Sequence, residues 1–201
     1  MVAVAAGAVL VLSTSRSQLP ERPSLPLAVI AEEGAAILGS GVPAVVEFGD
    51  YQCVGCAETE RRYDMLRERW TDRAPPNRSI HYRHLPNTAR HEWSEEAARY
   101  SICMEDSGAF GGFHRALFRY QDSVQRPDFV EVALAESARL SLALDVEALL
   151  GCVDGAESRE RLARDVALAE ALGVRGTPTF FSAAEVRIGA PALDWLEALL
   201  F

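Results

Sequence analysis

The sequence contains no lysine, and its net charge is strongly negative. All 20 basic residues of the 201-residue chain are arginines, and 29 acidic residues outnumber them, which gives a formal net charge of −9. Without an excess of positive charge the protein has no basic surface to neutralise phosphates, which argues against a nucleic-acid partner. Arginine and the abundant alanine both have GC-rich codons, so the composition favours a high-GC bacterial source.

The chain also lacks a hydrophobic run at its N-terminus that could span a membrane. Residues 2–12 are apolar, but a membrane-spanning helix needs about 20 such residues. Small polar residues follow at 13–15, as in the apolar core and cleavage region of a secretory signal. The usual preceding positive charges are absent, so we expect the true start to lie upstream. We predict a signal or anchor segment with a linker over residues 1–27; the alternative is a buried strand or helix.

Cysteines are few, and only two of them are close together. The four cysteines are Cys53, Cys56, Cys103 and Cys152. A structural zinc site usually combines two close pairs of ligands. The first two cysteines form one such pair, but the other two are far apart, and His81 and His84 fall on a predicted strand. We therefore favour redox chemistry over zinc, and we expect neither a metal nor a cofactor.

Hydrophobic patterns predict strands and helices on both sides of the close cysteine pair. An apolar run at 43–50 and an alternating pattern at 79–86 are typical of strands, and residues 54–70 between them have the pattern of an amphipathic helix. Two short strands are expected within 177–189 and a final helix at 191–200. The other helices are predicted at 92–105, 109–121, 128–140, 145–153 and 158–172.

The predicted order of elements indicates the fold class. Without the long helical block, the order is β-α-β followed by β-β-α, which is the order of a thioredoxin-like core. We therefore predict an α/β protein with a thioredoxin-like fold and an inserted all-helical domain. The expected boundaries are 28–90 for the first thioredoxin-like part, 91–173 for the helical insertion and 174–201 for the second thioredoxin-like part.

The close cysteine pair stands where a strand ends and a helix begins. The unpaired N–H groups at a helix N-terminus lower the pKa of a cysteine placed there. Cys53 is therefore the expected nucleophile, and Cys56, one helical turn later, is the expected resolving cysteine. Glu47 lies in the preceding apolar strand, where a carboxylate is costly without a partner or a function. We interpret Glu47 as a buried proton acceptor for Cys56; the alternative is an edge-strand glutamate that faces water.

A second feature is the Thr177–Pro178 dipeptide in the sequence RGTPTF. Bonds that precede proline are the only common cis peptide bonds. We expect a cis bond here, which would direct backbone groups toward the cysteine sulfurs and a bound substrate. The alternative is an ordinary trans proline at the start of a strand.

Taken in order, these features resemble the DsbA-like thiol–disulfide oxidoreductases of the thioredoxin superfamily. The resemblance covers most of 28–201 and is carried by FGDYQCVGC (48–56), GAFGGFHRALF (108–118) and LARDVALAEALGVRGTPTFF (162–181). It implies a thioredoxin fold with Cys53 as nucleophile, Cys56 as resolving cysteine, Glu47 as buried acid and 177–178 as a cis-proline loop. Family members often carry proline and then an aromatic residue or histidine between the cysteines, where this chain has valine and glycine.

Cys103 and Cys152 both fall in predicted helices of the insertion. In an exported protein we expect them to form a structural disulfide, and some DsbA-like proteins of Gram-positive and actinobacterial type are similar in this respect. Two free buried thiols are the alternative. His114, on an apolar predicted helix, is interpreted as a semi-buried packing residue rather than a ligand.

The resemblance implies an extracytoplasmic enzyme of the periplasm or cell envelope, either released or tethered by an N-terminal anchor. It would introduce disulfides into exported proteins that carry cysteine thiols, and a quinone-linked membrane protein would reoxidise it. Two alternatives remain: a reductase or isomerase with a narrow client, and a non-enzymatic binding module with the same fold. We expect a monomer.

Overall fold

The computed structural model describes residues 23–70, 77–122 and 126–201. The predicted signal or anchor segment falls mostly on residues 1–22, which lie outside the described residues. Among the helices of the described ranges, none combines the length and the apolar character that crossing a membrane requires.

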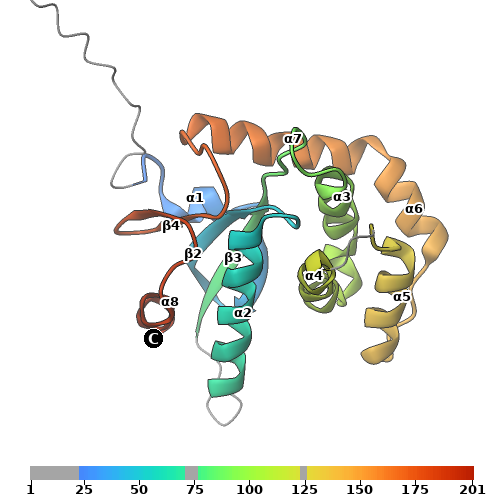
Figure 1. The fold of residues 1–201 in the computed structure, drawn as a ribbon, viewed down its shortest axis with the longest axis horizontal. Helices are drawn as coiled ribbons and strands as arrows, with labels where there is room; N and C mark the ends of the chain where they lie inside the picture. The colour runs from blue at the N-terminus through green and yellow to red at the C-terminus, as the bar shows by residue number, and fades with distance from the viewer. Residues whose placement is uncertain (1–22, 71–76, 123–125) are drawn as a thin grey trace, which may run out of the picture.

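A five-stranded mixed sheet forms the centre of the molecule (Figure 1). Its order is β1-β3-β2-β4-β5, with β2 and β3 parallel and the other pairs antiparallel. The strands are β1 Ala35–Gly39, β2 Val42–Gly49, β3 Arg78–His84, β4 Thr179–Ser182 and β5 Val186–Ile188. Glu47 pairs with Tyr82 on one side and Phe180 on the other, so it lies on the central strand and not at an edge.

Helices cover both faces of the sheet because successive side chains of β2 point to opposite sides. Val45 joins the apolar core formed with α2 and α8, whereas Val46 and Phe48 join a second core formed with α1 and α7. The bounds of these helices are α1 Leu27–Ala31, α2 Val54–Arg69, α7 Ala156–Ala171 and α8 Leu193–Leu200. The central strand is therefore buried on both faces, and its last residues lead directly to the cysteine pair.

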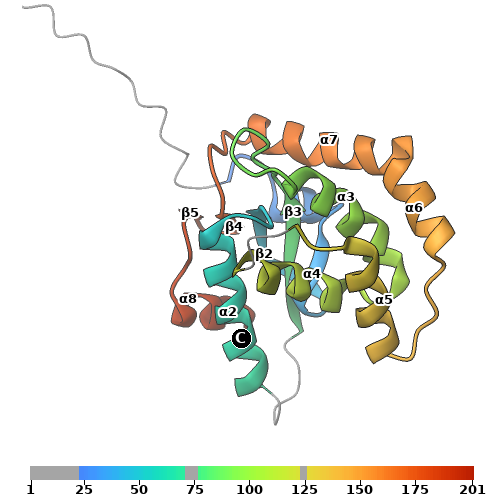
Figure 2. The same cartoon turned by 45° about the vertical axis from the view of Figure 1, so that its right-hand side comes forward.

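The remaining helices form a domain beside the sheet (Figure 2). They are α3 Ser94–Met104, α4 Phe110–Arg119, α5 Phe129–Arg139 and α6 Val146–Asp154, with 3-10 turns at Glu105–Ser107 and Tyr120–Asp122. Asp128 and Asp145 cap α5 and α6, since the Asp128 side chain accepts hydrogen bonds from two N–H groups of the first turn and the Asp145 side chain accepts one. The helix α7 runs from this domain back to the sheet. The predicted α/β fold with an inserted helical block is confirmed.

A disulfide joins two helices of this domain. Cys103 of α3 and Cys152 of α6 are bonded; their Cα atoms are 5.9 Å apart, and the two residues are 49 positions apart in sequence. The bridge therefore connects the first helix of the insertion to the helix that precedes α7.

The structure also contains two elements that the sequence patterns did not predict, α1 and β1. Leu27, assigned to the linker, is the first residue of α1. This helix has only five residues, and β1 is a five-residue edge strand of sequence AAILG. Neither is long enough for a helical or strand period to be recognised. The strand β1 pairs with β3 at the edge of the sheet, and α1 packs against β2 and β3.

Candidate active site

Cys53 and Cys56 lie at the N-terminus of α2, as the strand–helix pattern predicted. Cys53 is the N-cap residue and is half-buried, whereas Cys56, in the first turn, is 1% exposed. Both are free thiols. The backbone N–H groups of Cys56 and Ala57 donate to the Cys53 carbonyl, which fixes the first turn of the helix around the pair. An incoming thiol can therefore reach Cys53, while Cys56 is shielded.

The loop before β4 packs directly on this pair. The Thr177–Pro178 peptide bond is cis, and the Thr177 carbonyl oxygen lies 3.2 Å from the Cys53 sulfur. A Cβ atom at Gly55 would lie 2.8 Å from Cδ of Pro178, which is closer than real Cβ atoms approach other atoms. Glycine between the cysteines therefore allows the proline loop to make this close contact. The sequence alone showed the glycine but not its neighbour.

The surroundings of Cys53 stabilise a thiolate. Its pKa is lowered from an ordinary value of 9.0 to about 5, chiefly by a hydrogen bond from the Cys56 thiol. Partial burial opposes this shift, and hydrogen bonds from the Thr177 side chain and from the backbone N–H groups of Cys56 and Gly55 add to it. The pKa of Cys56 is raised well above its ordinary value, first by burial and then by its bond to Cys53. The two thiols thus differ strongly in acidity, with the more exposed one ionised at neutral pH.

Glu47 lies beneath the cysteines on β2. Its carboxylate accepts a 2.7 Å hydrogen bond from the Tyr63 hydroxyl of α2, and the residue is 1% exposed. Burial raises its pKa to about 8, although the bond from Tyr63 acts in the opposite direction. The charge of Glu47 also contributes to the raised pKa of Cys56. A carboxyl group with a pKa near neutrality is able to exchange a proton at physiological pH.

Asp50 is a further buried carboxylate at the site, and no sequence pattern assigned it a role. Its side chain accepts hydrogen bonds from the backbone N–H groups of Gln52 (2.8 Å) and Asn87 (2.7 Å), and it lies 2.7 Å from Nδ1 of His91. Its own backbone N–H lies 3.5 Å from the Cys56 sulfur. Asp50 therefore ties the turn before the cysteines to the loop after β3. Its position three residues before Cys53 was the only signal in the sequence.

A buried polar chain connects the site to the helical domain. The Tyr51 hydroxyl lies 2.5 Å from Oγ of Ser101 and 2.9 Å from Nδ1 of His114. The other ring nitrogen of His114 lies 3.3 Å from Glu60, which also binds Arg67 at 2.7 Å. His114 is thus fully buried with polar neighbours on both sides, rather than semi-buried as expected.

Gln121, in the turn after α4, reaches back to the active-site loop. Its side-chain amide donates to the carbonyl oxygens of Tyr51 and, at 3.1 Å, of Cys53. The contact joins residues 68 positions apart, so no local sequence pattern indicates it. Within the described ranges, no group of three or more His, Cys, Asp or Glu side chains is placed to hold a metal ion.

The comparisons with known proteins agree with this architecture. A family model described as Thioredoxin matches residues 41–200. Among solved structures, BdbD from Bacillus subtilis has a TM-score of 0.67 at 19% identity and covers 90% of this chain and 96% of its own. A thioredoxin-like oxidoreductase from Silicibacter pomeroyi scores 0.65 at 23% identity, covering 87% and 95%. The thiol-disulfide exchange protein alpha-DsbA2 from Wolbachia pipientis scores 0.61 at 20% identity, covering 80% and 81%.

Curated relatives resemble the chain over part of their own length. The Na(+)/H(+) antiporter NhaA 1 of Salinispora arenicola is 32% identical over 154 residues, which are 77% of this chain and 22% of that protein. The antiporter NhaA of Herminiimonas arsenicoxydans is 32% identical over 139 residues, 68% of this chain and 20% of that protein. The chain thus spans about a fifth of the length of these relatives. By its family match the chain belongs to the thioredoxin family, and a helical domain interrupts its thioredoxin-like fold.

Proposed function

We propose that the chain is a thiol–disulfide oxidoreductase that forms disulfides in client proteins. The observation that carries the proposal is the pairing of two unlike thiols at one helix N-terminus. Cys53 is accessible and has a pKa of about 5, and it contacts the cis-proline loop. Cys56 is buried next to it with a raised pKa. A nucleophile and a resolving thiol need this division of properties.

The reaction starts from an oxidised enzyme in which Cys53 and Cys56 are bonded. A client thiolate attacks the Cys53 sulfur, the Cys53–Cys56 bond breaks, and Cys56 departs with the electron pair and takes up a proton. A second client thiolate then attacks the client sulfur of the mixed disulfide, and Cys53 leaves as a stabilised thiolate. The client loses two electrons and the enzyme gains them, so the products are a client disulfide and the reduced pair.

We assign to Glu47 the exchange of the Cys56 proton. At neutral pH a carboxyl group with a pKa of about 8 is mostly protonated, so it can supply the proton that Cys56 takes up. When the pair is reoxidised, the same carboxylate accepts that proton, because Cys56 must become a thiolate to form the new bond. Tyr63 holds the carboxylate in place through its hydrogen bond.

The oxidising direction rests on the acidity of Cys53. A pKa of about 5 is below the value near 7 of the thioredoxin nucleophile and closer to that of strongly oxidising enzymes, about 3.5. A stabilised thiolate favours the reduced enzyme, so its disulfide is a stronger oxidant. We therefore expect a reduction potential, measured by equilibration with glutathione, above the roughly −270 mV of thioredoxin. A potential at or below that value would favour the alternative, a reductase or isomerase.

We also infer an extracytoplasmic location beside a membrane. The Cys103–Cys152 disulfide supports it, because such bonds persist in oxidising compartments. The curated relatives are named as Na(+)/H(+) antiporters, which supports a place near a membrane. A quinone-linked membrane protein is the proposed oxidant, and exported proteins with cysteine thiols are the proposed clients.

The activity is tested with Cys53→Ser and Cys56→Ser, assayed for the oxidation of a reduced two-cysteine peptide. Cys53→Ser should abolish the reaction, since no sulfur is left to form the mixed disulfide. Cys56→Ser is supplied with the peptide as an activated mixed disulfide, which its Cys53 thiolate attacks. Because no resolving thiol remains, the peptide should stay bonded to Cys53 in a complex that mass spectrometry detects. A rate of peptide oxidation in Cys53→Ser equal to that of the wild type would show that Cys53 takes no part in the reaction, and would identify the chain as a binding module instead.

A further inference from the structure

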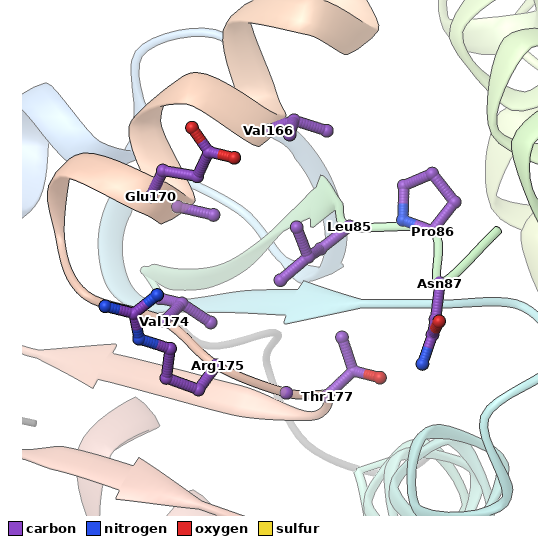
Figure 3. A pocket seen from close by; sticks show the side chains of 10 residues that line it. Leu85, Pro86, Asn87, Val166, Glu170, Val174, Arg175 and Thr177 are labelled. Atoms are coloured by element: carbon purple, nitrogen blue, oxygen red, sulfur yellow. The ribbon is translucent and has the colours of Figure 1, made fainter. Parts of the chain in front are cut away.

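A pocket opens next to the cis-proline loop, between the end of β3 and α7 (Figure 3). Its volume is about 360 Å³, and the apolar side chains of Leu85, Pro86, Val166 and Val174 line it. This volume is within the range of small ligand sites, and it accommodates one large apolar side chain with room to spare. Thr177 lines the same pocket and is the residue whose carbonyl contacts the Cys53 sulfur. Thr177 therefore connects the pocket to the reacting sulfur, although neither cysteine lines the pocket itself.

A second pocket of about 410 Å³ continues from the first along α7. The two share Pro86, Val166 and Glu170, and the second extends to Arg159 at the start of the helix. We call the two pockets together the α7 groove. Glu170 and Arg159 are eleven residues apart, which is about 16 Å along a helix at 1.5 Å per residue. An extended chain spans that length with about five residues.

The sequence of α7 keeps this groove open. The residues of α7 that line the second pocket of the groove include Ala163 and Ala167, which are exposed and small. A large side chain at either position would occupy the groove without displacing a buried atom. Ala171, the last residue of the same helix, is also exposed but lines neither pocket.

The rim of the groove carries two exposed charged side chains. Glu170 and Arg175 are both exposed, and neither forms an ion pair with another residue of the described ranges. Glu170 lies between the two pockets, since it lines both of them. A basic side chain that reaches this point can pair with it.

We propose that the α7 groove binds the extended segment of a client polypeptide that adjoins its reacting cysteine. The client places an apolar side chain in the pocket beside Thr177 and a basic side chain at Glu170. The proposal rests on the function assigned above, because the client cysteine is held on Cys53 during the reaction. The groove thereby gives the enzyme a preference among clients that the backbone contacts at the cis-proline loop do not supply.

The test compares Ala167→Trp with the matched control Ala171→Trp. Each protein, in its oxidised form, is mixed with dithiothreitol or with a reduced peptide in which leucine and arginine follow the first cysteine, and the rate at which its Cys53–Cys56 bond is reduced is measured over a range of substrate concentrations. Ala167→Trp should raise KM for the peptide about tenfold, equal to about 1.4 kcal/mol of binding. It should oxidise dithiothreitol at the wild-type rate, which also shows that it folds. Ala171→Trp should match the wild type on both substrates.

A charge reversal tests the contact at Glu170. Glu170→Arg should raise KM for the arginine peptide and lower it for a peptide with glutamate in the same place. Equal peptide KM values for Ala167→Trp and Ala171→Trp would overturn the proposal. A second result would also overturn it: a wild-type protein that sediments as a dimer, while Ala167→Trp sediments as a monomer and Ala171→Trp does not, because a second copy of the chain would then occupy the groove. A wild-type protein that oxidises neither substrate would instead refute the oxidoreductase function itself.

Discussion

Replacing Glu47 by glutamine should stabilise the folded protein at alkaline pH and leave it nearly unchanged at acid pH. The carboxylate is fully buried, and its pKa is about 8 in the folded state against an ordinary value of 4.5. Folding therefore favours the protonated form. Below pH 4.5 the carboxyl group is neutral in both states, so glutamine, which can also accept the Tyr63 hydrogen bond, is a close substitute.

The magnitude follows from the two pKa values. Between pH 4.5 and pH 8 the unfolded chain releases the Glu47 proton while the folded chain retains it, so the wild-type protein loses stability as the pH rises through this window. At ~1.4 kcal/mol per pKa unit, the loss reaches about 5 kcal/mol. Glutamine has no proton to release, so the variant does not share this loss. Over this pH window the unfolding free energy of Glu47→Gln should therefore rise, relative to that of the wild type, by that amount.

The assay is urea unfolding of the two proteins at several pH values from 4.5 to 8.5. Both proteins carry Cys53→Ser and Cys56→Ser, so that their redox state is fixed and the Cys103–Cys152 bridge stays intact. Parallel curves of stability against pH would refute the reasoning, because they would mean that Glu47 ionises as easily in the folded protein as in the unfolded chain.

Two further predictions concern packing and covalent structure. Gly55→Ala should destabilise the protein by about 1–3 kcal/mol in urea, because its Cβ atom would lie 2.8 Å from Pro178. The control Gly151→Ala, whose Cβ atom would meet nothing within 4 Å inside α6, should instead stabilise it by about 0.5–1 kcal/mol, and a loss of equal size in both variants would contradict this account. Replacing both Cys103 and Cys152 by serine should cost about 4 kcal/mol of unfolding free energy, since the bridge closes a loop of about 50 residues in the unfolded chain. An unchanged unfolding midpoint for that double variant would show that the bridge does not restrict the unfolded chain.

The sequence was sufficient to predict the longer helices and strands, their order and the fold class. Long amphipathic helices such as α7 and buried strands such as β2 have periods that can be read locally, and their order indicated the fold. The junction of a strand and a helix also placed Cys53 and Cys56 correctly, because position relative to a helix N-terminus is a local property.

What the sequence did not predict depends on contacts between distant segments. Gln121 approaches the Cys53 carbonyl across 68 residues, and Asn87 approaches Asp50 across 37. Gly55 was visible as an unusual residue between the cysteines. The close contact that requires glycine there is made by Pro178, more than 120 positions away. Such residues are brought together by the topology of the sheet, which places the loops after β2 and β3 next to the loop before β4.

The pH dependence of Cys53 alkylation tests the central claim most directly. In the protein reduced at Cys53 and Cys56, the rate of reaction with iodoacetamide follows the thiolate fraction, and peptide mass spectrometry identifies the modified residue. We predict that Cys53 is alkylated first and that its rate rises with a midpoint at about pH 5. A midpoint near the ordinary cysteine value of 9.0, or alkylation of Cys56 before Cys53, would contradict the assignment of Cys53 as the nucleophile.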